Sequence, residues 1–199
     1  MSLLVETIRT EEGRLLNISF HNERMKRSLY GIFGLKNETD LEKLIVVPEF
    51  ARKGIYKCRV EYDQKIRKID FFLYKIKPVN SLKLIENNEI DYRFKFLNRE
   101  AIDRLMANRG ECDDIIIIKN GFVTDSSYAN LIFMDRSGNQ VTPETFLLKG
   151  TRRESMLKQG LITEKKINYS DINKYIKVKL INAMIGLNDT EGIPVGNIE

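Results

Sequence analysis

Five residues near the middle of the chain constrain the fold more than any other segment. Residues 114–118 read Asp-Ile-Ile-Ile-Ile, and Lys-Asn-Gly and then Phe-Val-Thr follow at 119–121 and 122–124. A continuous run of β-branched apolar residues of this length predicts a strand that is buried on both faces. Because Asn-Gly readily adopts the positive φ angles of a tight turn, the chain should return at once as a second strand.

The first third of the chain predicts a small α+β unit. Its pattern is strand, strand, helix, strand, strand, and Gly34 follows the helix as a C-cap. On one strand, alternate residues from Tyr56 to Tyr62 share an apolar face and the residues between them share a charged face. The predicted elements are strands at 3–9 and 14–19, a helix at 22–33 and strands at 56–62 and 68–76.

Pro78 and the irregular residues after it separate this unit from a second one. The sequence therefore predicts an α+β chain with an N-terminal domain at 1–78, a linker at 79–82 and a larger C-terminal α/β pseudo-barrel domain at 83–199. Elements expected in the second part, beside the strands at 114–124, are strands at 82–85, 130–135 and 177–181 and helices at 98–108, 150–157 and 169–175.

Composition narrows the classes of function. The chain has 199 residues and a net charge of +5, from 33 Lys and Arg against 28 Asp and Glu that are scattered among them. This balance suits anionic small molecules, and in the absence of a recognition motif it does not predict specific nucleic-acid binding. No apolar run is long enough for a membrane helix and the first residues do not resemble a signal peptide, so we expect a cytoplasmic protein.

The number and spacing of the cysteines and the histidine argue against further classes of function. Cys58 and Cys112 have no cysteine or histidine near them in a metal-ligand pattern, and we expect both to be reduced thiols. His21 is the single histidine, so a His-rich metal site cannot form and a Ser-His-Asp triad would depend on that one residue. We therefore expect no metal site and no hydrolase chemistry of the usual kind.

Two short segments have the chemistry of anion sites. Gly150-Thr151 stands at the start of a predicted helix, where free N–H groups and the helix dipole attract a phosphate. His21-x-x-Arg24 also begins near a helix, and its guanidinium could contact an oxyanion. Taken alone, each is as well explained by an ordinary helix start or a solvated helix face.

Four motifs that follow one another along the chain indicate that these segments belong to one site. They are Lys-Phe-Leu-Asn-Arg at 95–99, the strand at 114–118, Val-Thr-Asp-Ser-Ser-Tyr-Ala-Asn at 123–130 and Gly-Thr-Arg at 150–152. With Arg24 upstream, they resemble the class IV aminotransferase family, whose pattern is a lysine followed by Asn-Arg, an Asp-Glu strand, Val-Thr-Glu-(Gly/Ala/Cys)-Ser-x-x-Asn and Pro-Gly-(Ile/Val)-Thr-Arg. The resemblance implies the two-domain pyridoxal-phosphate fold type IV, similar to D-amino acid aminotransferase, with a shortened N-terminal domain.

The resemblance also implies a role for each matching residue. Lys95 would hold pyridoxal 5'-phosphate as a Schiff base and transfer protons at the substrate carbon. Asp125 would pair with the protonated pyridine nitrogen of the cofactor. The phosphate would bind Arg24 and the start of the helix, and the cofactor-binding set is Lys95, Arg24, Asp125, Gly150, Thr151, Ala183 and Met184.

Within the family, Asn-Ala-Met at 182–184 looks like the Asn-Ala-Leu of aminodeoxychorismate lyases. This implies release of pyruvate from 4-amino-4-deoxychorismate to give 4-aminobenzoate. An aminotransferase of D- or branched-chain amino acids and a cofactor-binding protein with little turnover remain as alternatives. Family members are typically homodimers, so we expect a homodimer that takes a small-molecule amino substrate.

Two departures from the family pattern affect the expected site. Asp125 replaces the usual glutamate, so its carboxylate reaches one methylene less far. The family's Tyr-Gly-Asp-Gly segment, which normally precedes Phe-Glu-Thr-x-Arg, has no counterpart before residues 5–9, so other loops or a partner subunit must complete the substrate pocket. The substrate carboxylate needs a cation, for which Arg59, Arg93 and Arg99 are unranked candidates.

Overall fold

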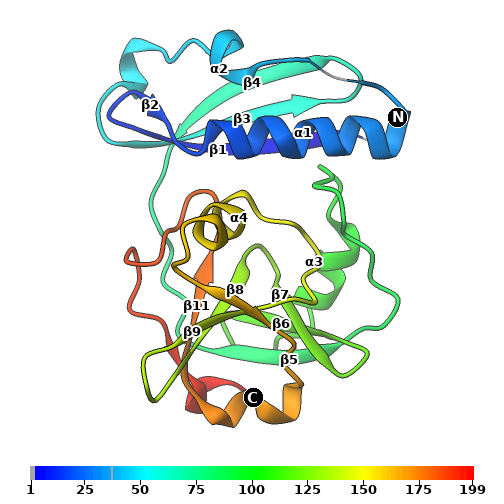
Figure 1. Cartoon of the computed structure of the whole chain (residues 1–199), viewed down its shortest axis with the longest axis vertical. Coiled ribbons are helices and arrows are strands. Elements are labelled where there is room, and N and C mark those ends of the chain that lie inside the picture. The colour runs from blue at the N-terminus through cyan, green and yellow to red at the C-terminus, as the bar shows by residue number, and fades with distance from the viewer. Residues whose placement is uncertain (1–2, 37) are drawn as a thin grey trace. The chain divides into compact units, whose positions relative to one another are not determined.

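The computed structural model describes residues 3–36 and 38–199, which form two compact units (Figure 1). One unit comprises the described part of residues 1–76 together with Phe94–Asn98, and the other comprises Lys77–Arg93 and Arg99–Glu199. The chain thus passes from the first unit to the second at Lys77, close to the linker predicted at 79–82.

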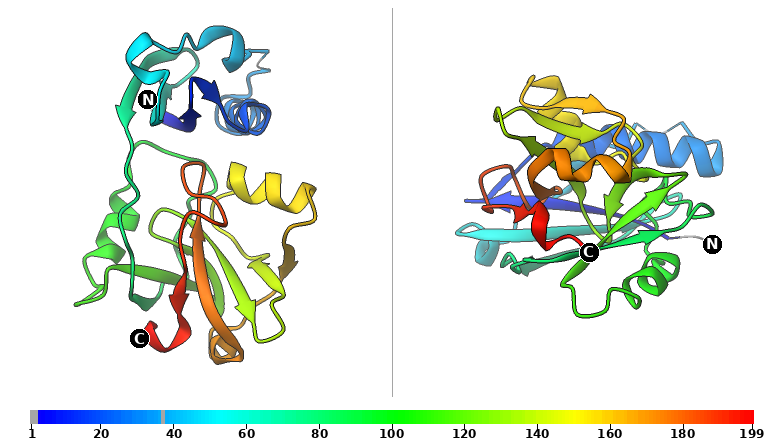
Figure 2. Two further views of the ribbon diagram at one scale, coloured as in Figure 1. Left: turned by 90° about the vertical axis from the view of Figure 1, so that its left-hand side faces the viewer. Right: turned by 90° about the horizontal axis from the view of Figure 1, so that it is seen from below.

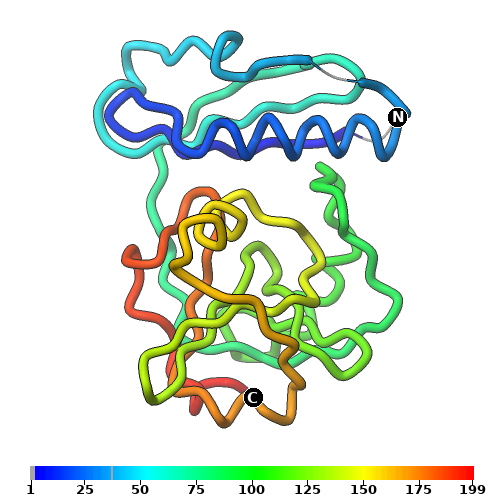
Figure 3. Tube along the Cα trace, viewed as in Figure 1, coloured from blue at the N-terminus to red at the C-terminus, as the bar shows by residue number. Residues whose placement is uncertain are grey.

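The amino-terminal unit is a four-stranded antiparallel sheet in the order β2-β1-β3-β4, with helix α1 along one face (Figures 1 and 2). Apolar side chains of α1, β1 and β3 form its core, which includes Met25, Leu29, Ile8 and Val60. Figure 3 traces this course in blue and cyan. The elements are β1 Leu4–Glu11, β2 Arg14–Leu15, α1 Ile18–Phe33, α2 Leu41–Leu44, a 3-10 helix Glu49–Ala51, β3 Ile55–Tyr62 and β4 Ile66–Leu73.

Helix α1 is longer than the sequence pattern predicts. It begins at Ile18, after Asn17 in the left-handed region (φ 54°), so the strand predicted at 14–19 is wrong beyond Leu15. The predicted C-cap at Gly34 is confirmed, because Gly34 has φ 67° and its N–H donates to the Tyr30 carbonyl. The buried face of α1 carries polar His21 and Arg24 beside its apolar residues. Because the helix was predicted from the spacing of apolar residues, its true start was missed.

The segment Phe94–Asn98 belongs to the amino-terminal unit, which corrects the assignment of Lys95 to a domain at 83–199. The N–H of Val5 donates to the Lys95 carbonyl at 3.0 Å, so this segment pairs with the beginning of β1. Phe94 and Phe96 stack edge to face and pack against the core of the sheet and α1. Backbone pairing and aromatic burial therefore return the chain to the first unit after it has entered the second.

The carboxy-terminal unit contains an eight-stranded sheet. Strands follow the order β10-β9-β8-β7-β6-β5, and β11 pairs with both β8 and β12. Beside helices α3 and α4, its described residues form two 3-10 helices. The elements are β5 Leu82–Glu86, α3 Glu100–Met106, β6 Asp114–Lys119, β7 Phe122–Ser126, β8 Asn130–Asp135, β9 Gln140–Pro143, α4 Thr151–Lys158, β10 Thr163–Lys165, 3-10 helix Tyr169–Lys174, β11 Tyr175–Ile181, β12 Ile193–Pro194 and 3-10 helix Val195–Asn197.

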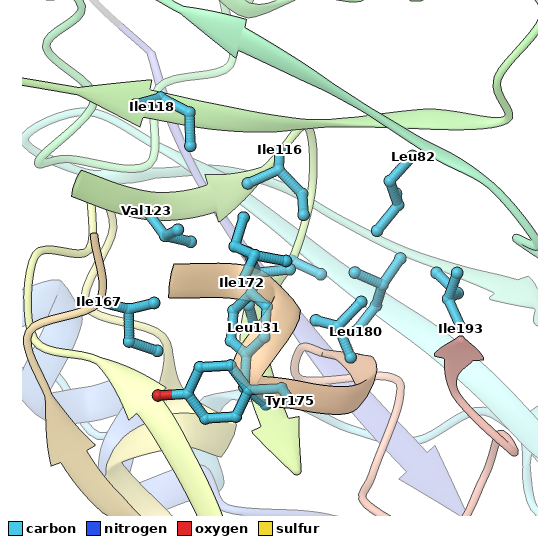
Figure 4. Close-up of a cluster of buried hydrophobic side chains, with 13 residues drawn as sticks. Leu82, Ile116, Ile118, Val123, Leu131, Ile167, Ile172, Tyr175, Leu180 and Ile193 are labelled. Carbon is cyan, nitrogen blue, oxygen red and sulfur yellow. The ribbon is translucent and has the colours of Figure 1, made fainter. Parts of the chain in front are cut away.

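Strand β6 is buried on both faces, as the isoleucine run predicts. It lies between parallel β5 and antiparallel β7, and Asn120 and Gly121 form the predicted turn with φ angles of 52° and 78°. Figure 4 shows Ile116, Leu131 and Leu180 directed into a common core. Burial of these side chains fixes the strands that carry the candidate site residues.

In the carboxy-terminal unit, one prediction needs correction and two strands were missed. Residues 169–175 do not form an α-helix, because Tyr169–Lys174 is a 3-10 helix that leads directly into β11. Strands β9 and β10 were not predicted. They are short and have partly exposed faces, so their sequences lack the long apolar run or alternation that marks a buried strand.

Cys58 and Cys112 are free and buried, in agreement with the expected thiols. Burial, together with the charge of Asp70, raises the pKa of Cys58 to about 12. In the part of the chain that the structure describes, no helix is long and apolar enough to cross a membrane. Within the same residues, no group of three His, Cys, Asp or Glu side chains is placed to bind a metal ion.

Candidate active site

A buried charged cluster lies between β1 and α1 in the amino-terminal unit. The Arg24 guanidinium donates from Nε to Glu6 Oε1 at 2.9 Å and from Nη2 to Glu6 Oε2 at 2.5 Å. Nδ1 of His21 lies 2.5 Å from the same Oε2 atom. Glu6 lies among apolar residues on the side of β1 that faces α1, and His21 and Arg24 lie one turn apart on α1. Regular secondary structure therefore brings the three side chains together.

The charges of this cluster are mutually compensating. Burial alone would raise the pKa of Glu6, but the charge of Arg24 and hydrogen bonds from His21 and Arg24 lower it to about 2. Burial lowers the pKa of His21, and the charges of Arg24 and Lys95 lower it further against the opposing effect of Glu6. Glu6 is therefore ionised and His21 neutral at pH 7, with the imidazole proton on Nδ1, where it donates to Glu6.

Lys95 is half-buried in the same unit as this cluster. The Val5 N–H donates to the Lys95 carbonyl, and the charge of Lys95 helps to lower the pKa of His21, so its ammonium group lies within electrostatic range of the imidazole. Two of the predicted site residues, Lys95 and Arg24, thus belong to the same unit. The predicted phosphate contact of Arg24 would have to be made in addition to its two bonds to Glu6.

Asp125 is buried at the end of β7 in the carboxy-terminal unit. Its Oδ1 accepts a hydrogen bond from Asn130 Nδ2 at 2.7 Å, and its Oδ2 accepts from the N–H groups of Leu147 and Leu148, both at 2.9 Å. Burial raises the pKa of Asp125 to about 6, although these three donors and the charge of Arg153 act to lower it. The shorter carboxylate is thus held by a loop that folds over it.

The same loop leads into α4. Gly150 is the N-cap residue of this helix, and Thr151 is its first residue and is buried. The predicted helix start at Gly150-Thr151 is confirmed. Gly150 has φ −73°, which any residue adopts, so its backbone does not require glycine. Space does require it, because a Cβ at this position would lie 1.9 Å from Asn130 Oδ1.

Ala183 and Met184 lie in a tight turn that follows β11. The N–H groups of Met184 and Ile185 donate to the Asn182 side-chain Oδ1 at 2.8 and 3.0 Å. The Met184 N–H, which we predicted to contact a phosphate, thus donates within the turn, and its phosphate contact stays a prediction. The carbonyl of Ala183 accepts a hydrogen bond from Arg152 Nη2 at 3.4 Å, which links this turn to α4.

The three candidate arginines differ in their surroundings. Arg93 is exposed and is held by Asp91 through both Nε and Nη2. Arg99 donates to the Ser127 carbonyl at 2.6 Å. Arg59 lies on β3 with its side chain 33% exposed and pairs with Glu61 through Nη2 at 2.9 Å. Arg59 thus has one described ion pair, with Glu61, whereas Arg93 is held by Asp91 through two nitrogen atoms.

Two residues that the sequence reasoning did not assign are central to these contacts. Glu6 is the buried partner of Arg24, and Asn130 connects Asp125 with the loop before α4. Both belong to the motifs quoted above, as the glutamate of residues 5–9 and the asparagine of residues 123–130. Their motif positions were a signal, but burial and hydrogen-bond partners were needed to give them a role.

Taken one unit at a time, the side chains suit separate parts of a phosphorylated pyridine aldehyde. The amino-terminal unit has a lysine amine and an arginine, and the carboxy-terminal unit has a buried acid and a helix amino terminus joined by one loop. A buried carboxylate suits a protonated ring nitrogen, and guanidinium and helix N–H groups suit a phosphate. Gly150, where a Cβ would clash with Asn130, is the N-cap residue of this helix.

Comparison with known proteins identifies the family. The model of the class IV amino-transferase family matches residues 73–189, more than half of the chain. The protein belongs to this family, whose members are pyridoxal-phosphate-dependent transferases and lyases. The predicted α+β fold type IV is confirmed.

Individual relatives add detail. An uncharacterized protein of Haemophilus influenzae is 40% identical over 187 residues, which cover 92% of this chain and 98% of that protein. A crystal structure from Haemophilus somnus, named "putative 4-amino-4-deoxychorismate lyase", is 36% identical, covers 94% of this chain and 98% of its own, and has a TM-score of 0.88. The pyridoxal-phosphate-bound form of a hypothetical aminotransferase from Mycobacterium tuberculosis shares the fold, with 14% identity, coverage of 99% and 81%, and a TM-score of 0.74.

Proposed function

We propose that this protein is a pyridoxal-phosphate-dependent 4-amino-4-deoxychorismate lyase. The observation that carries the cofactor assignment is the buried Asp125 carboxylate, held next to the amino-terminal end of α4. The choice of lyase is supported by the Haemophilus somnus protein of that name and by Asn-Ala-Met at 182–184. When bound, the cofactor would supply an electron-accepting ring that stabilises negative charge at the substrate carbon.

Lys95 would hold the cofactor through its amine and transfer protons. It would remove the proton from the substrate carbon that bears the amino group. The C–O bond to the enolpyruvyl group then breaks, the ring becomes aromatic, and the departing enolpyruvate takes up a proton to become pyruvate. The products, 4-aminobenzoate and pyruvate, together contain all the atoms of the substrate, so no second substrate is consumed.

Asp125 and the phosphate donors would fix the cofactor. Asp125 would accept a hydrogen bond from the protonated pyridine nitrogen, and this positive charge would favour the ionised form of the carboxyl at pH 7. Arg24, Gly150 and Thr151 would contact the phosphate, with the N–H of Ala183 as a further donor. Met184 would contribute only by sharing an N–H that already donates to Asn182.

The reaction is tested by product analysis on the protein loaded with pyridoxal phosphate. We expect equal amounts of pyruvate and 4-aminobenzoate from 4-amino-4-deoxychorismate without an added 2-oxo acid. Lys95→Ala should abolish both products, whereas Lys43→Ala, which changes an exposed lysine paired with Asp40, should not. Pyridoxal phosphate that binds without turnover would contradict the proposal and favour a cofactor-binding protein.

An aminotransferase of D- or branched-chain amino acids is the second candidate. It is favoured by the family itself and by the aminotransferases that share the fold. Lys95 would perform the same proton transfers, but a 2-oxo acid would be needed as amino acceptor. Formation of a new amino acid that depends on an added 2-oxo acid would establish this reaction in place of the lyase.

A homodimer is part of the proposal. Several large apolar side chains of the amino-terminal unit are exposed, including Val46, Phe50 and Leu73, and β4 is an edge strand of its sheet. Exposed apolar side chains and edge strands are each typical of association surfaces. Light scattering coupled to gel filtration should give twice the 23.2 kDa chain mass, and a monomer at micromolar concentration would contradict the dimer.

A further inference from the structure

We propose that Asn130 is a positioning residue that joins the Asp125 carboxylate and the amino-terminal end of α4 into one rigid arrangement. We further infer that residue 150 is glycine in order to admit the Asn130 amide. The inference rests on the proposed function, since it concerns how the same cofactor site is held in place. It assigns no contact between Asn130 and the cofactor.

The backbone of Asn130 lies where three site segments meet. It is the first residue of β8, where it pairs with Asp125 of β7 on one side and with Ile181 of β11 on the other. Strand β11 ends there and leads into the turn that contains Ala183 and Met184. The side chain of Asn130 therefore projects from a fixed point between the buried acid and two segments of the proposed phosphate site.

The side-chain amide of Asn130 donates to two acceptors from different segments. Nδ2 donates to Asp125 Oδ1 at 2.7 Å and to the Leu148 carbonyl at 2.9 Å. The N–H of Leu148 in turn donates to Asp125 Oδ2. Asp125, Asn130 and Leu148 thus form a closed set of hydrogen bonds, in which movement of the loop breaks a bond to a buried carboxylate. Such bonds to an ionised group are among the stronger ones in proteins.

The carbonyl end of the Asn130 amide occupies the space beside Gly150. A Cβ on residue 150 would lie 1.9 Å from Oδ1 of Asn130, closer than any allowed contact, and 3.1 Å from its Cγ, which is also tight. An alanine there would force the amide away from Asp125 and Leu148, or force the start of α4 outward. Since the φ of Gly150 is ordinary, this contact is the physical reason for glycine at the position.

The experiment compares Asn130→Ala, Gly150→Ala and the double variant with the natural chain. Asn139→Ala is the matched control, because Asn139 also donates from Nδ2 to an aspartate, Asp135, but on an exposed turn. Two quantities are measured. One is the pKa of the Asp125 carboxyl, from ¹³C NMR titration of the cofactor-free protein. The other is the ratio of the affinities for pyridoxal phosphate and for pyridoxal, which isolates the binding of the phosphate.

We expect Asn130→Ala to raise the pKa of Asp125, because a donor that lowers it is lost. The affinity ratio should fall by about tenfold, the lower end of the loss seen when a residue that orients a metal ligand is removed. Gly150→Ala should change both quantities in the same direction. The double variant should be no worse than the more affected single variant, since both changes disrupt one contact. Asn139→Ala should leave both unchanged.

An unchanged Asp125 pKa in Asn130→Ala would overturn the inference, as would independent, additive effects of the two substitutions. If Asn130→Ala fails to fold, the Asp125 titration in Gly150→Ala decides the question in the same way. Failure of the natural chain to bind pyridoxal phosphate would refute the proposed function alone. The titrations of the cofactor-free variants would still test the role of Asn130.

Discussion

Glu6 and Arg24 form a buried, two-bond ion pair between β1 and α1, with Nε and Nη2 of the guanidinium on the two carboxylate oxygens. The pair is almost fully removed from solvent, and the Glu6 side chain is 0% exposed. Buried ion pairs are costly to break because the remaining charge stays in a medium of low polarity. This pair therefore fixes the direction of a residue that we propose as a phosphate ligand.

Replacement of Glu6 should be strongly destabilising. Glu6→Gln keeps the shape but removes the ionised partner of Arg24, and we expect the free energy of unfolding to fall by about 3–5 kcal/mol. Urea unfolding at pH 7 measures this. Glu49→Gln is the control, because Glu49 pairs with Arg52 on the exposed surface and should change stability by less than about 1 kcal/mol. Equal effects of the two substitutions would contradict the role of Glu6.

The same glutamate predicts a pH dependence at low pH. Its folded pKa of about 2 lies below the ordinary 4.5, so its stabilising contribution is complete above about pH 4.5. This contribution is lost as the pH falls from 4.5 towards 2. The difference in free energy of unfolding between the natural chain and Glu6→Gln should shrink across this window, and a constant difference would contradict the ionised state of Glu6.

The raised pKa of Asp125 predicts that stability depends on pH in the opposite direction. Its folded pKa of about 6 lies above the ordinary 3.8, so the folded state binds more protons than the unfolded state between these values. The free energy of unfolding should therefore decrease as the pH rises from about 4 to 6, by up to about 3 kcal/mol. Asp125→Asn should lack this decrease when the cofactor-free proteins are compared by urea unfolding, and parallel pH profiles would contradict it.

Arg59 is our candidate for the substrate carboxylate. Arg59→Gln should raise KM by about tenfold or more with little change in kcat, because a charge-assisted contact to the bound substrate is lost. Arg93→Gln is the control, since Arg93 is exposed and saturated by Asp91. Steady-state kinetics distinguish the two. A raised KM in Arg93→Gln and not in Arg59→Gln would reverse the assignment.

The sequence predicted the elements whose patterns are strong and local. The isoleucine run of β6, the turn at Asn120 and Gly121 and the C-cap at Gly34 depend on neighbouring residues and were confirmed. The start of α1 was missed because His21 and Arg24 interrupt its apolar face. Their burial depends on Glu6 from β1, a partner distant in sequence that no local pattern reveals.

In the candidate site, too, local motifs could be read from the sequence, whereas contacts between distant residues could not. The order of motifs predicted roles for Lys95 and Asp125, but not the unit to which Lys95 belongs, because that depends on backbone pairing with β1. Motif position likewise assigned the Met184 N–H to a phosphate, whereas the Asn182 side chain folds back onto it. Gly150 was read as part of a helix start. Its requirement for glycine comes from Asn130, which only the folded chain places beside it.

The central claim is that Lys95 holds the cofactor, and borohydride reduction tests it directly. The protein is incubated with pyridoxal phosphate, reduced, digested and analysed by mass spectrometry. We predict one modified peptide, labelled at Lys95, and loss of the yellow colour of the bound cofactor. Lys95→Arg should remain unlabelled. A label on another lysine, or no label while Lys95 is intact, would contradict the account.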